Sequence, residues 1–143
     1  MDDRHGYYVE DLAPGMSEVF SKTITEADLL MFAGVSGDTN PLHLDQDFAS
    51  RTMFEGRIAH GMLTGSLVST VLGTKLPGPG AVYVSQQLKF LAPVRIGDTV
   101  IARAVVADIN LERRRVRLET TCWVGETKVL EGEAILMVPR RPN

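Results

Sequence analysis

The chain has 143 residues, of which 44% are hydrophobic and 23% are charged, so it holds enough apolar material for one sizeable core. Its formal net charge of −3 argues against a nucleic-acid partner and gives no electrostatic attraction to anionic membranes. The start, MDDRH, is polar, and no apolar run approaches the roughly 20 residues of a membrane helix. The single cysteine, Cys122, cannot form an internal disulfide and is expected to be a packed thiol, so we expect a cytoplasmic protein.

The first part of the chain predicts a strand, a helix and a long irregular segment. Residues 16–24 alternate loosely, as in a strand. Thr25 and Asp28 then fit a capping box, and apolar residues at helical spacing predict a helix that ends near Gly34. Residues 36–57 predict an irregular segment with one or two short helical turns, whose apolar side chains indicate packing rather than disorder. Loops this long in compact domains are usually functional or disordered.

The rest of the chain predicts a second helix and four strands. From His60 to about Lys75 the pattern is apolar on nearly every side, which is typical of a helix inside the protein. The sequence PGPG at 77–80 ends it. Strand-like runs follow at 81–91, 99–109, 115–124 and 128–138. Because runs joined by short turns pair antiparallel, we predict one α+β domain over residues 1–143, with an antiparallel sheet across a buried helix.

Asp38 and His43 are the leading candidates for chemistry among the polar residues. Turn backbone rather than helix joins them, so the two side chains can converge on one point. A carboxylate and an imidazole placed in this way can hold a water molecule and move protons. Asn40 supplies an amide that can orient the water or brace the imidazole. The alternative is that Asp38 and Asn40, both common turn formers, bond only their own backbone.

The dipeptide His60-Gly61 at the start of the buried helix predicts an oxyanion site. The first N–H groups of a helix have no intrahelical partner and carry a partial positive charge. A glycine there lets a carbonyl oxygen come close, which suits a thioester that gathers negative charge as water adds at C3. The alternative is that Gly61 only permits close packing.

Other kinds of site have weaker support in the sequence. There is no GxSxG sequence for a serine hydrolase, and one cysteine without paired histidines leads us to expect no metal site. The GTK at 73–75 lacks the upstream glycine of a phosphate loop. The basic run RRRVR at 113–117 is expected to be a solvated strand end. Contact with the phosphates of CoA is the second interpretation, and nucleic acid is the third because no aromatic residues interleave with the arginines.

Three stretches together resemble the MaoC-like dehydratase family, most closely its R-specific enoyl-CoA hydratases that feed polyhydroxyalkanoate synthesis. The first is residues 32–43, with SGDTNPLH at its centre. The second is RIAHGML at 57–63, and the third is FLAPV at 90–94 followed by GDTV at 97–100. They occur in order with compatible spacing, and the similarity covers about residues 20–138.

The resemblance implies a hotdog fold, in which a long antiparallel sheet wraps around a central helix of residues 61–75. Residues 36–57 would be the overhang that covers the acyl chain. Asp38 and His43 would be the catalytic pair, with Asn40 as helper and the Gly61 N–H as donor to the substrate carbonyl. The resemblance also implies a homodimer with its sheets joined edge to edge, which would protect the edge strands.

The resulting hypothesis is reversible hydration of trans-2-enoyl-CoA to (3R)-3-hydroxyacyl-CoA, with the CoA thioester as substrate and no cofactor. One helix face is predicted to line the acyl pocket, and its members are Met62, Gly65, Ser69 and Leu72. The nearest alternative is a 3-hydroxyacyl-ACP dehydratase. More distant alternatives are a hotdog thioesterase and a non-catalytic acyl-CoA-binding module, and the complete set of Asp38, Asn40 and His43 disfavours the module.

Overall fold

Residues 2–143 are described by a computed structural model, in which five strands form one sheet in the order β1-β3-β4-β5-β2. Every pair of neighbouring strands runs antiparallel. The strands are β1 (Ser17–Thr23), β2 (Val82–Phe90), β3 (Thr99–Asn110), β4 (Arg115–Val124) and β5 (Thr127–Met137). The strand β2 pairs with β5 rather than with β3, its successor in the chain, because residues 91–98 carry the chain across to the other side of the sheet.

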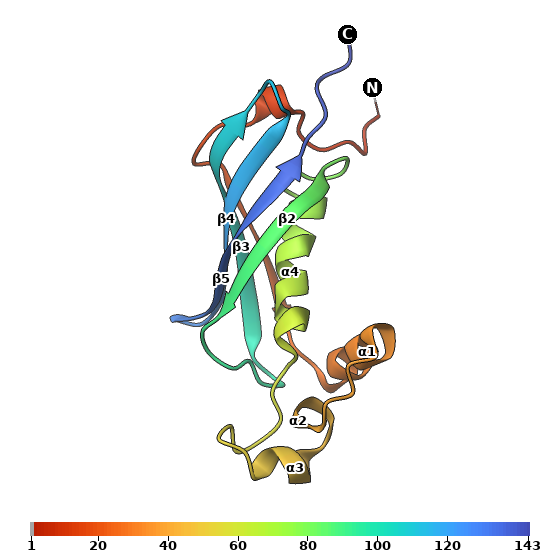
Figure 1. The fold of residues 1–143 in the computed structure, drawn as a ribbon, viewed down its shortest axis with the longest axis vertical. Helices are drawn as coiled ribbons and strands as arrows, with labels where there is room; N and C mark the ends of the chain where they lie inside the picture. The colour runs from red at the N-terminus through yellow and green to blue at the C-terminus, as the bar shows by residue number, and fades with distance from the viewer. Residues whose placement is uncertain (1) are drawn as a thin grey trace.

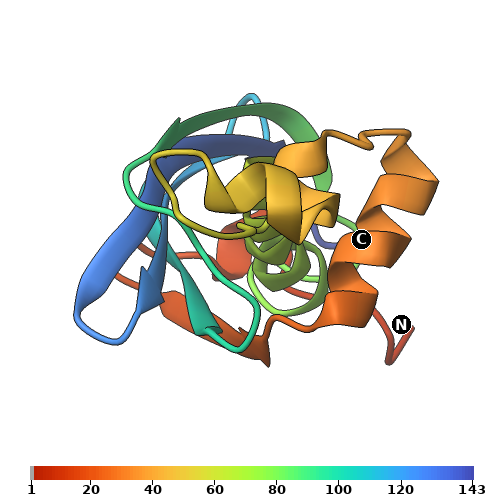
Figure 2. The same cartoon turned by 90° about the horizontal axis from the view of Figure 1, so that it is seen from below.

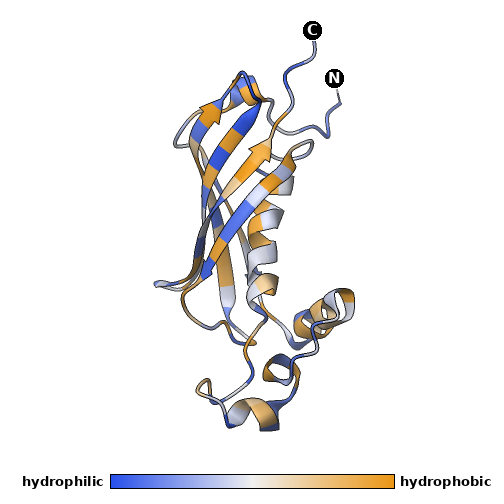
Figure 3. Ribbon diagram, in the orientation of Figure 1, coloured by the Kyte–Doolittle hydropathy of each residue, from blue (hydrophilic) through white to orange (hydrophobic). Residues whose placement is uncertain are grey.

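The helix α4 (Gly61–Thr74) lies along the concave side of this sheet. Figure 2 shows the sheet curving around it. No charged residue occurs along the helix, and Figure 3 shows it in pale and hydrophobic colours from end to end. A helix without a polar face is stable in water only when other elements cover it. This arrangement confirms the predicted α+β class and the hotdog fold.

The core between sheet and helix follows the period-two pattern of the strands. Inward side chains of β3 and β4 are at most 1% exposed, and they include Val100, Ala102, Leu118 and Cys122. The outward positions of β4 are mostly polar, and Figure 3 shows alternating colours along this strand. Burial raises the pKa of the Cys122 thiol to about 12, which confirms a packed structural thiol.

Three helices lie beyond the end of the sheet at which α4 begins (Figure 1), and the last two belong to the overhang at residues 36–57. The three helices are α1 (Glu26–Ser36), α2 (Pro41–Leu44) and α3 (Gln46–Ser50). The turn η1 (Val9–Asp11) lies near the opposite end of the molecule. Among residues 2–143, no helix has the length and apolar character needed to cross a membrane.

The start of α1 agrees with the sequence, but its end does not. The capping box is present, with the Asp28 N–H bonded to the Thr25 hydroxyl and the Asp28 carboxylate bonded to the Thr25 N–H. The predicted end near Gly34 is two residues early, because the helix continues to Ser36. It ends at Gly37, whose φ of 79° provides the left-handed cap that closes a helix. A glycine inside a helix costs only about 1 kcal/mol relative to alanine, which is too little to end it at Gly34.

The apolar side of β2 is largely exposed in a single chain, although its sequence predicts a half-buried strand. Val82, Val84 and Phe90 are 53%, 51% and 52% exposed. The strand lies at the edge of the sheet, and α4 meets it where Leu88 lies against Gly65 and Phe90 lies against Gly61. A bulge between Tyr83 and Ser85 interrupts the alternation in β2, so residues before and after it do not share one face. Much of the apolar surface of the strand has no cover within one chain.

Candidate active site

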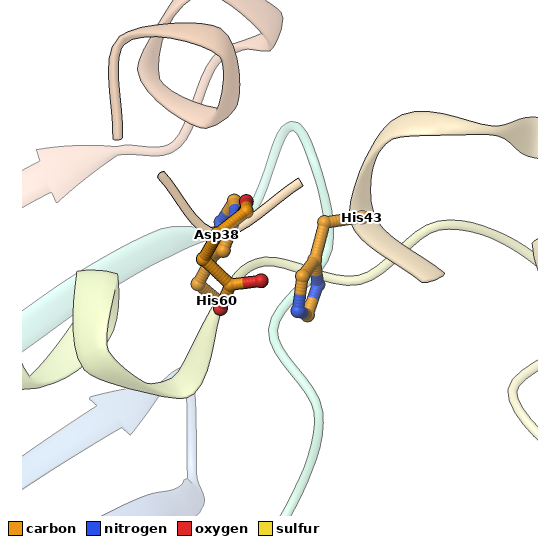
Figure 4. A group of neighbouring side chains, drawn as sticks. All are labelled: Asp38, His43 and His60. Carbon is orange, nitrogen blue, oxygen red and sulfur yellow. The ribbon is translucent and has the colours of Figure 1, made fainter. Parts of the chain in front are cut away.

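Short-range hydrogen bonds shape the turn that carries Asp38. The Ser36 hydroxyl accepts the Asp38 N–H at 3.1 Å, and Asp38 Oδ1 accepts the Asn40 N–H at 3.2 Å. Asn40 Oδ1 in turn caps α2 by accepting the Leu42 N–H at 3.0 Å. Asp38 and Asn40 therefore bond nearby backbone groups, as the turn-former alternative predicted. One carboxylate oxygen of Asp38 nevertheless points toward His43 (Figure 4).

His43 is held by the backbone on the side away from Asp38. Its Nδ1 lies 2.8 Å from the carbonyl oxygen of Ile58. Because a carbonyl can only accept, Nδ1 carries the hydrogen and Nε2 keeps its lone pair for the cavity. Arg57 steadies the same turn, since its Nε donates to the His43 carbonyl at 2.6 Å while its guanidinium bonds both carboxylate oxygens of Glu26. The imidazole is therefore fixed in tautomer and orientation.

The surroundings of His43 favour its neutral form. Its side chain is 7% exposed, and this burial lowers the pKa below the usual value. The hydrogen bond to Ile58 and the negative charge of Asp38 act in the opposite direction, while His60 lowers the pKa further. A neutral imidazole beside a carboxylate can accept a proton near neutral pH, as a general base must.

His60 joins the pair as a third polar side chain that the sequence interpretation treated only as the start of a helix. One nitrogen or oxygen atom from each of Asp38, His43 and His60 lies within 4.8 Å of the others (Figure 4). His60 is 1% exposed and occupies the N-cap of α4. The signal for it was present in the sequence: it is one of three histidines, and it directly precedes Gly61 in a stretch that carries the resemblance.

The spacing of this trio is compatible with a metal ion, but one nitrogen of each imidazole is already engaged by a backbone carbonyl. His60 Nε2 lies 3.0 Å from the Asp38 carbonyl oxygen, and among residues 2–143 its enclosed Nδ1 has no hydrogen-bond partner. The rings of His43 and His60 overlap, with centroids 4.0 Å apart and planes at 31°. The geometry suits a water molecule and proton transfer, and the absence of a metal stays a prediction.

Gly61 lies at the open end of α4, beside Phe90. The first bonds of the helix run from the N–H groups of Leu63 and Thr64 to the His60 carbonyl. The N–H groups of Gly61 and Met62 precede them, and His60 makes no side-chain cap bond. A Cβ on Gly61 would lie 2.8 Å from Phe90 Cε1, so only glycine fits here without displacing that ring. The site therefore combines the positive end of a helix with two N–H groups that make no bond within it.

These groups open into one cavity of about 610 Å³. Its wall is mostly apolar and comes from the overhang, the start of α4 and the segment after β2: Asp38, His43, Met53, Phe54, Ile58, Ala59, His60, Gly61, Met62, Thr64, Phe90, Leu91, Ala92, Pro93, Val94 and Val129. The whole FLAPV stretch at 90–94 lies in this wall, a role that the sequence left open. An apolar cavity with a few converging polar groups is the usual form of a small-molecule site.

The remaining predicted site residues are spread along α4 and the turn. Met62 borders the cavity. Gly65 is buried against Leu88, Ser69 is exposed, and Leu72 is 1% exposed in the core, and none of these three borders the cavity. Asn40 is exposed and outside the wall.

The basic run at 113–117 lies away from the cavity within this chain. It includes the turn between β3 and β4, which Figure 1 places at the end of the sheet opposite the overhang. No arginine borders the cavity among the described residues. This placement agrees with a solvated strand end.

Comparison with known proteins gives matches over most of the chain. The family model described as MaoC like domain matches residues 12–128. The (R)-specific enoyl-CoA hydratase of Rhodospirillum rubrum is 54% identical over 140 residues, covering 98% of this chain and 97% of that protein. The 3-hydroxybutyryl-CoA dehydratase of Methylorubrum extorquens is 54% identical over 94% of this chain and 85% of that protein. The solved (R)-hydratase from Aeromonas caviae, involved in PHA biosynthesis, superposes with a TM-score of 0.88 at 40% identity, covering 91% of this chain and 99% of that one.

Proposed function

The chain belongs to the MaoC-like domain family, and we propose that it acts as an (R)-specific enoyl-CoA hydratase. The reaction is the reversible addition of water to trans-2-enoyl-CoA, which gives (3R)-3-hydroxyacyl-CoA. One observation carries the proposal: the Asp38 carboxylate and the imidazole of His43 converge in an apolar cavity beside the open N-terminus of α4. The names of the two relatives at 54% identity support the same reaction class.

The start of α4 activates the substrate in this proposal. The thioester carbonyl accepts the N–H of Gly61, at the positive end of the helix dipole. Polarisation of the carbonyl withdraws electrons from the conjugated double bond and makes C3 electrophilic. The Phe90 ring, which packs where a Gly61 side chain would be, keeps bulk water from this face of the thioester.

Asp38 and His43 then hold the reacting water between them. One group takes a proton from the water as its oxygen forms a bond with C3, and the electrons of the double bond move toward the carbonyl. The other group delivers a proton to C2 on the same face. The two groups titrate as a coupled pair, so the roles of acid and base belong to the pair until each is measured. The addition needs neither oxidant nor reductant, and the proposal therefore includes no cofactor.

The cavity accommodates the reacting end of the acyl chain. Phe54 and Met53 of the overhang close one side, and Val129 and Val94 lie in its wall. We include Met62 in the acyl site because it borders the same space. Gly65, Ser69 and Leu72 stay predicted contacts for a longer acyl chain. If this helix face binds the chain, a larger side chain at Ser69 should shorten the acyl length that the enzyme prefers.

We also propose that the protein is a homodimer joined through β2. Several exposed side chains of that edge strand are apolar, with Val82, Val84 and Phe90 about half exposed. The other edge strand, β1, carries Glu18 and Lys22 and buries none of its residues fully. Pairing β2 with its copy would satisfy the strand's free backbone groups and cover this apolar surface.

The oligomeric state can be tested with one charge on each edge of the sheet. Light scattering coupled to size exclusion should give twice the chain mass for wild type. Val84→Lys on β2 should shift the mass toward the monomer, whereas Ser21→Lys on β1 should leave it unchanged. A monomeric wild type would reject the dimer.

The carrier, the location and the pathway extend the proposal. CoA is favoured over acyl carrier protein because the relatives named for acyl carrier protein are 36% and 34% identical, below the 54% of those named for CoA. Cytoplasmic location is proposed from the single buried thiol, which needs no oxidising compartment. A role in supplying (R)-3-hydroxyacyl-CoA for polyhydroxyalkanoate synthesis is proposed from the likeness to the Aeromonas caviae enzyme.

The deciding experiment follows the enoyl-thioester absorbance band of crotonyl-CoA with wild type and with His43→Ala. A loss of absorbance with wild type only, without release of free thiol, supports the hydratase. Thiol release would instead identify a thioesterase, and binding without turnover would identify a non-catalytic acyl-CoA-binding module. If crotonyl-CoA is unchanged, longer enoyl-CoA and enoyl-ACP substrates decide between chain length and carrier.

A further inference from the structure

His60 contacts both members of the Asp38 and His43 pair. Its ring lies against that of His43, with centroids 4.0 Å apart. Its other aromatic neighbour is Phe32, whose ring centroid is 4.8 Å away. Its Nε2 lies 3.0 Å from the backbone carbonyl oxygen of Asp38. His60 is only 1% exposed, and it borders the cavity together with Asp38 and His43.

The hydrogen bond from His60 connects Asp38 to a distant part of the chain. The other bonds of Asp38 among the described residues reach Ser36 and Asn40, two residues away on either side. Local bonds fix the shape of a turn, but they do not fix its position relative to the rest of the fold. The bond from His60 connects this turn to the N-cap of α4, 22 residues later in the chain.

One ring nitrogen of His60 has no hydrogen-bond partner among residues 2–143. The Asp38 carbonyl accepts, so Nε2 carries the hydrogen and Nδ1 holds the lone pair. Within residues 2–143 this buried Nδ1 has no hydrogen-bond partner. A buried polar atom without a partner costs free energy, on the order of 1–3 kcal/mol. The fold accepts that cost at the one residue that touches Asp38, His43 and, through the chain, Gly61.

On the basis of the proposed function, we propose that His60 is a positioning residue, which sets the gap between Asp38 and His43 where water binds. The hydrogen bond places the Asp38 turn, and the overlapping ring limits the tilt of His43. Because His60 immediately precedes Gly61, the same residue relates the water site to the N–H that receives the thioester carbonyl. His60 itself exchanges no proton with substrate.

Two substitutions separate the two contacts. His60→Phe keeps a ring against His43 but loses the bond to Asp38, whereas His60→Gln keeps an N–H donor but loses the ring. Val71→Ala, in the buried far half of α4, is the control for loss of stability alone. Each variant is assayed with crotonyl-CoA for kcat and KM, and its thermal midpoint is recorded.

We expect the Phe variant to lose about 10²-fold in kcat with KM changed little, because a misplacement of about 1 Å can cost that much. The Gln variant should recover part of the loss, since the donor to Asp38 is restored. Val71→Ala should melt earlier but keep the wild-type kcat. Folded Phe and Gln variants with kcat within threefold of wild type would overturn the positioning role and leave the hydratase function intact.

Hydrogen exchange tests the same role without turnover. In the Phe variant the amides of residues 36–44 should exchange faster than in wild type and in Val71→Ala, because the turn has lost its tie to α4. Unchanged exchange in that segment would overturn the role even if the wild-type protein hydrates no enoyl thioester. Wild-type inactivity would by itself reject only the proposed function.

Discussion

The two ends of helix α4 have the same apolar composition but different surroundings. At the C-terminal end, Val71 and Leu72 are at most 1% exposed and are packed among sheet side chains. At the N-terminal end, His60 and Gly61 border the cavity, together with Asp38 from the overhang. The sheet-covered end contributes stability through burial, and the open end contributes the chemistry.

The comparison shows that stability and reactivity reside in different parts of one continuous helix. Burial of apolar surface is non-directional, so a packed core holds the helix without aiming any polar group. A reactive site needs direction, and here hydrogen bonds to backbone carbonyls supply it for His43 and His60. Substitutions at the two ends should therefore affect turnover and the free energy of unfolding separately.

The largest effect is expected at the catalytic pair. Asp38→Asn and His43→Gln should each lower kcat for crotonyl-CoA by roughly 10²–10⁴-fold, as is typical for a general acid–base group. The thermal midpoint of Asp38→Asn should change little, because that side chain is exposed. Asp45→Asn is a matched control, since Asp45 caps α3 in the same overhang but does not border the cavity. Either pair variant with near wild-type turnover would remove the assignment.

A substitution in the core between sheet and helix should lower stability but leave turnover unchanged. Leu118 lies on the central strand β4 and is fully buried, so Leu118→Ala should reduce the free energy of unfolding by roughly 2–5 kcal/mol through lost burial and a cavity. Urea denaturation measures the loss, and kcat is taken at a temperature where the variant is folded. Turnover per folded molecule should equal that of wild type. A large fall in kcat would show that the sheet and the site are coupled.

Much of the fold was predictable because strong local signals determine it. The capping box at Thr25, the uniformly apolar helix after His60 and the alternating strands each appear in the sequence and in the structure. The end of α1 was missed because one glycine inside a helix has too small an effect to stop it. The exposure of β2 was missed because alternation indicates which face is apolar and not what covers it.

The candidate site was predicted less completely, for a physical reason. Asp38, His43 and Gly61 stand out because their residue types carry chemistry in turns and at helix ends. The contacts of His60 with Asp38 and His43 depend on how α4 meets the overhang, and no sequence spacing reports that distance. The role of FLAPV as a wall likewise depends on the packing of Phe90 over Gly61.

A smaller effect on turnover is expected at Gly61. Gly61→Ala would place a methyl group 2.8 Å from Phe90 Cε1, but that ring is 52% exposed and can move. The fold should therefore survive, while the displaced carbonyl site should lower kcat/KM by roughly 10²-fold or less. Adding Phe90→Leu relieves the ring contact, and a loss that persists would show that the backbone at Gly61 has a role beyond packing against Phe90. Full recovery in the double variant would show that Gly61 serves only close packing.

The smallest effect concerns the dependence of stability on pH, which reports the environment of His43 directly. Burial lowers the pKa of His43 below its ordinary value of 6.5, so the folded chain takes up that proton only at lower pH than the unfolded chain. As pH falls through 6.5, the unfolded state binds a proton that the folded state does not, and the free energy of unfolding should decrease. Above that pH both states are neutral at His43, and its contribution should be constant.

His43→Gln lacks this proton, so the stability of wild type minus that of the variant should fall from about pH 7 to 5, within the range where histidines titrate. Urea denaturation of the two proteins across that range measures the difference. If the stability difference between wild type and His43→Gln stays constant, or grows as the pH falls, then the surroundings of His43 do not favour its neutral form.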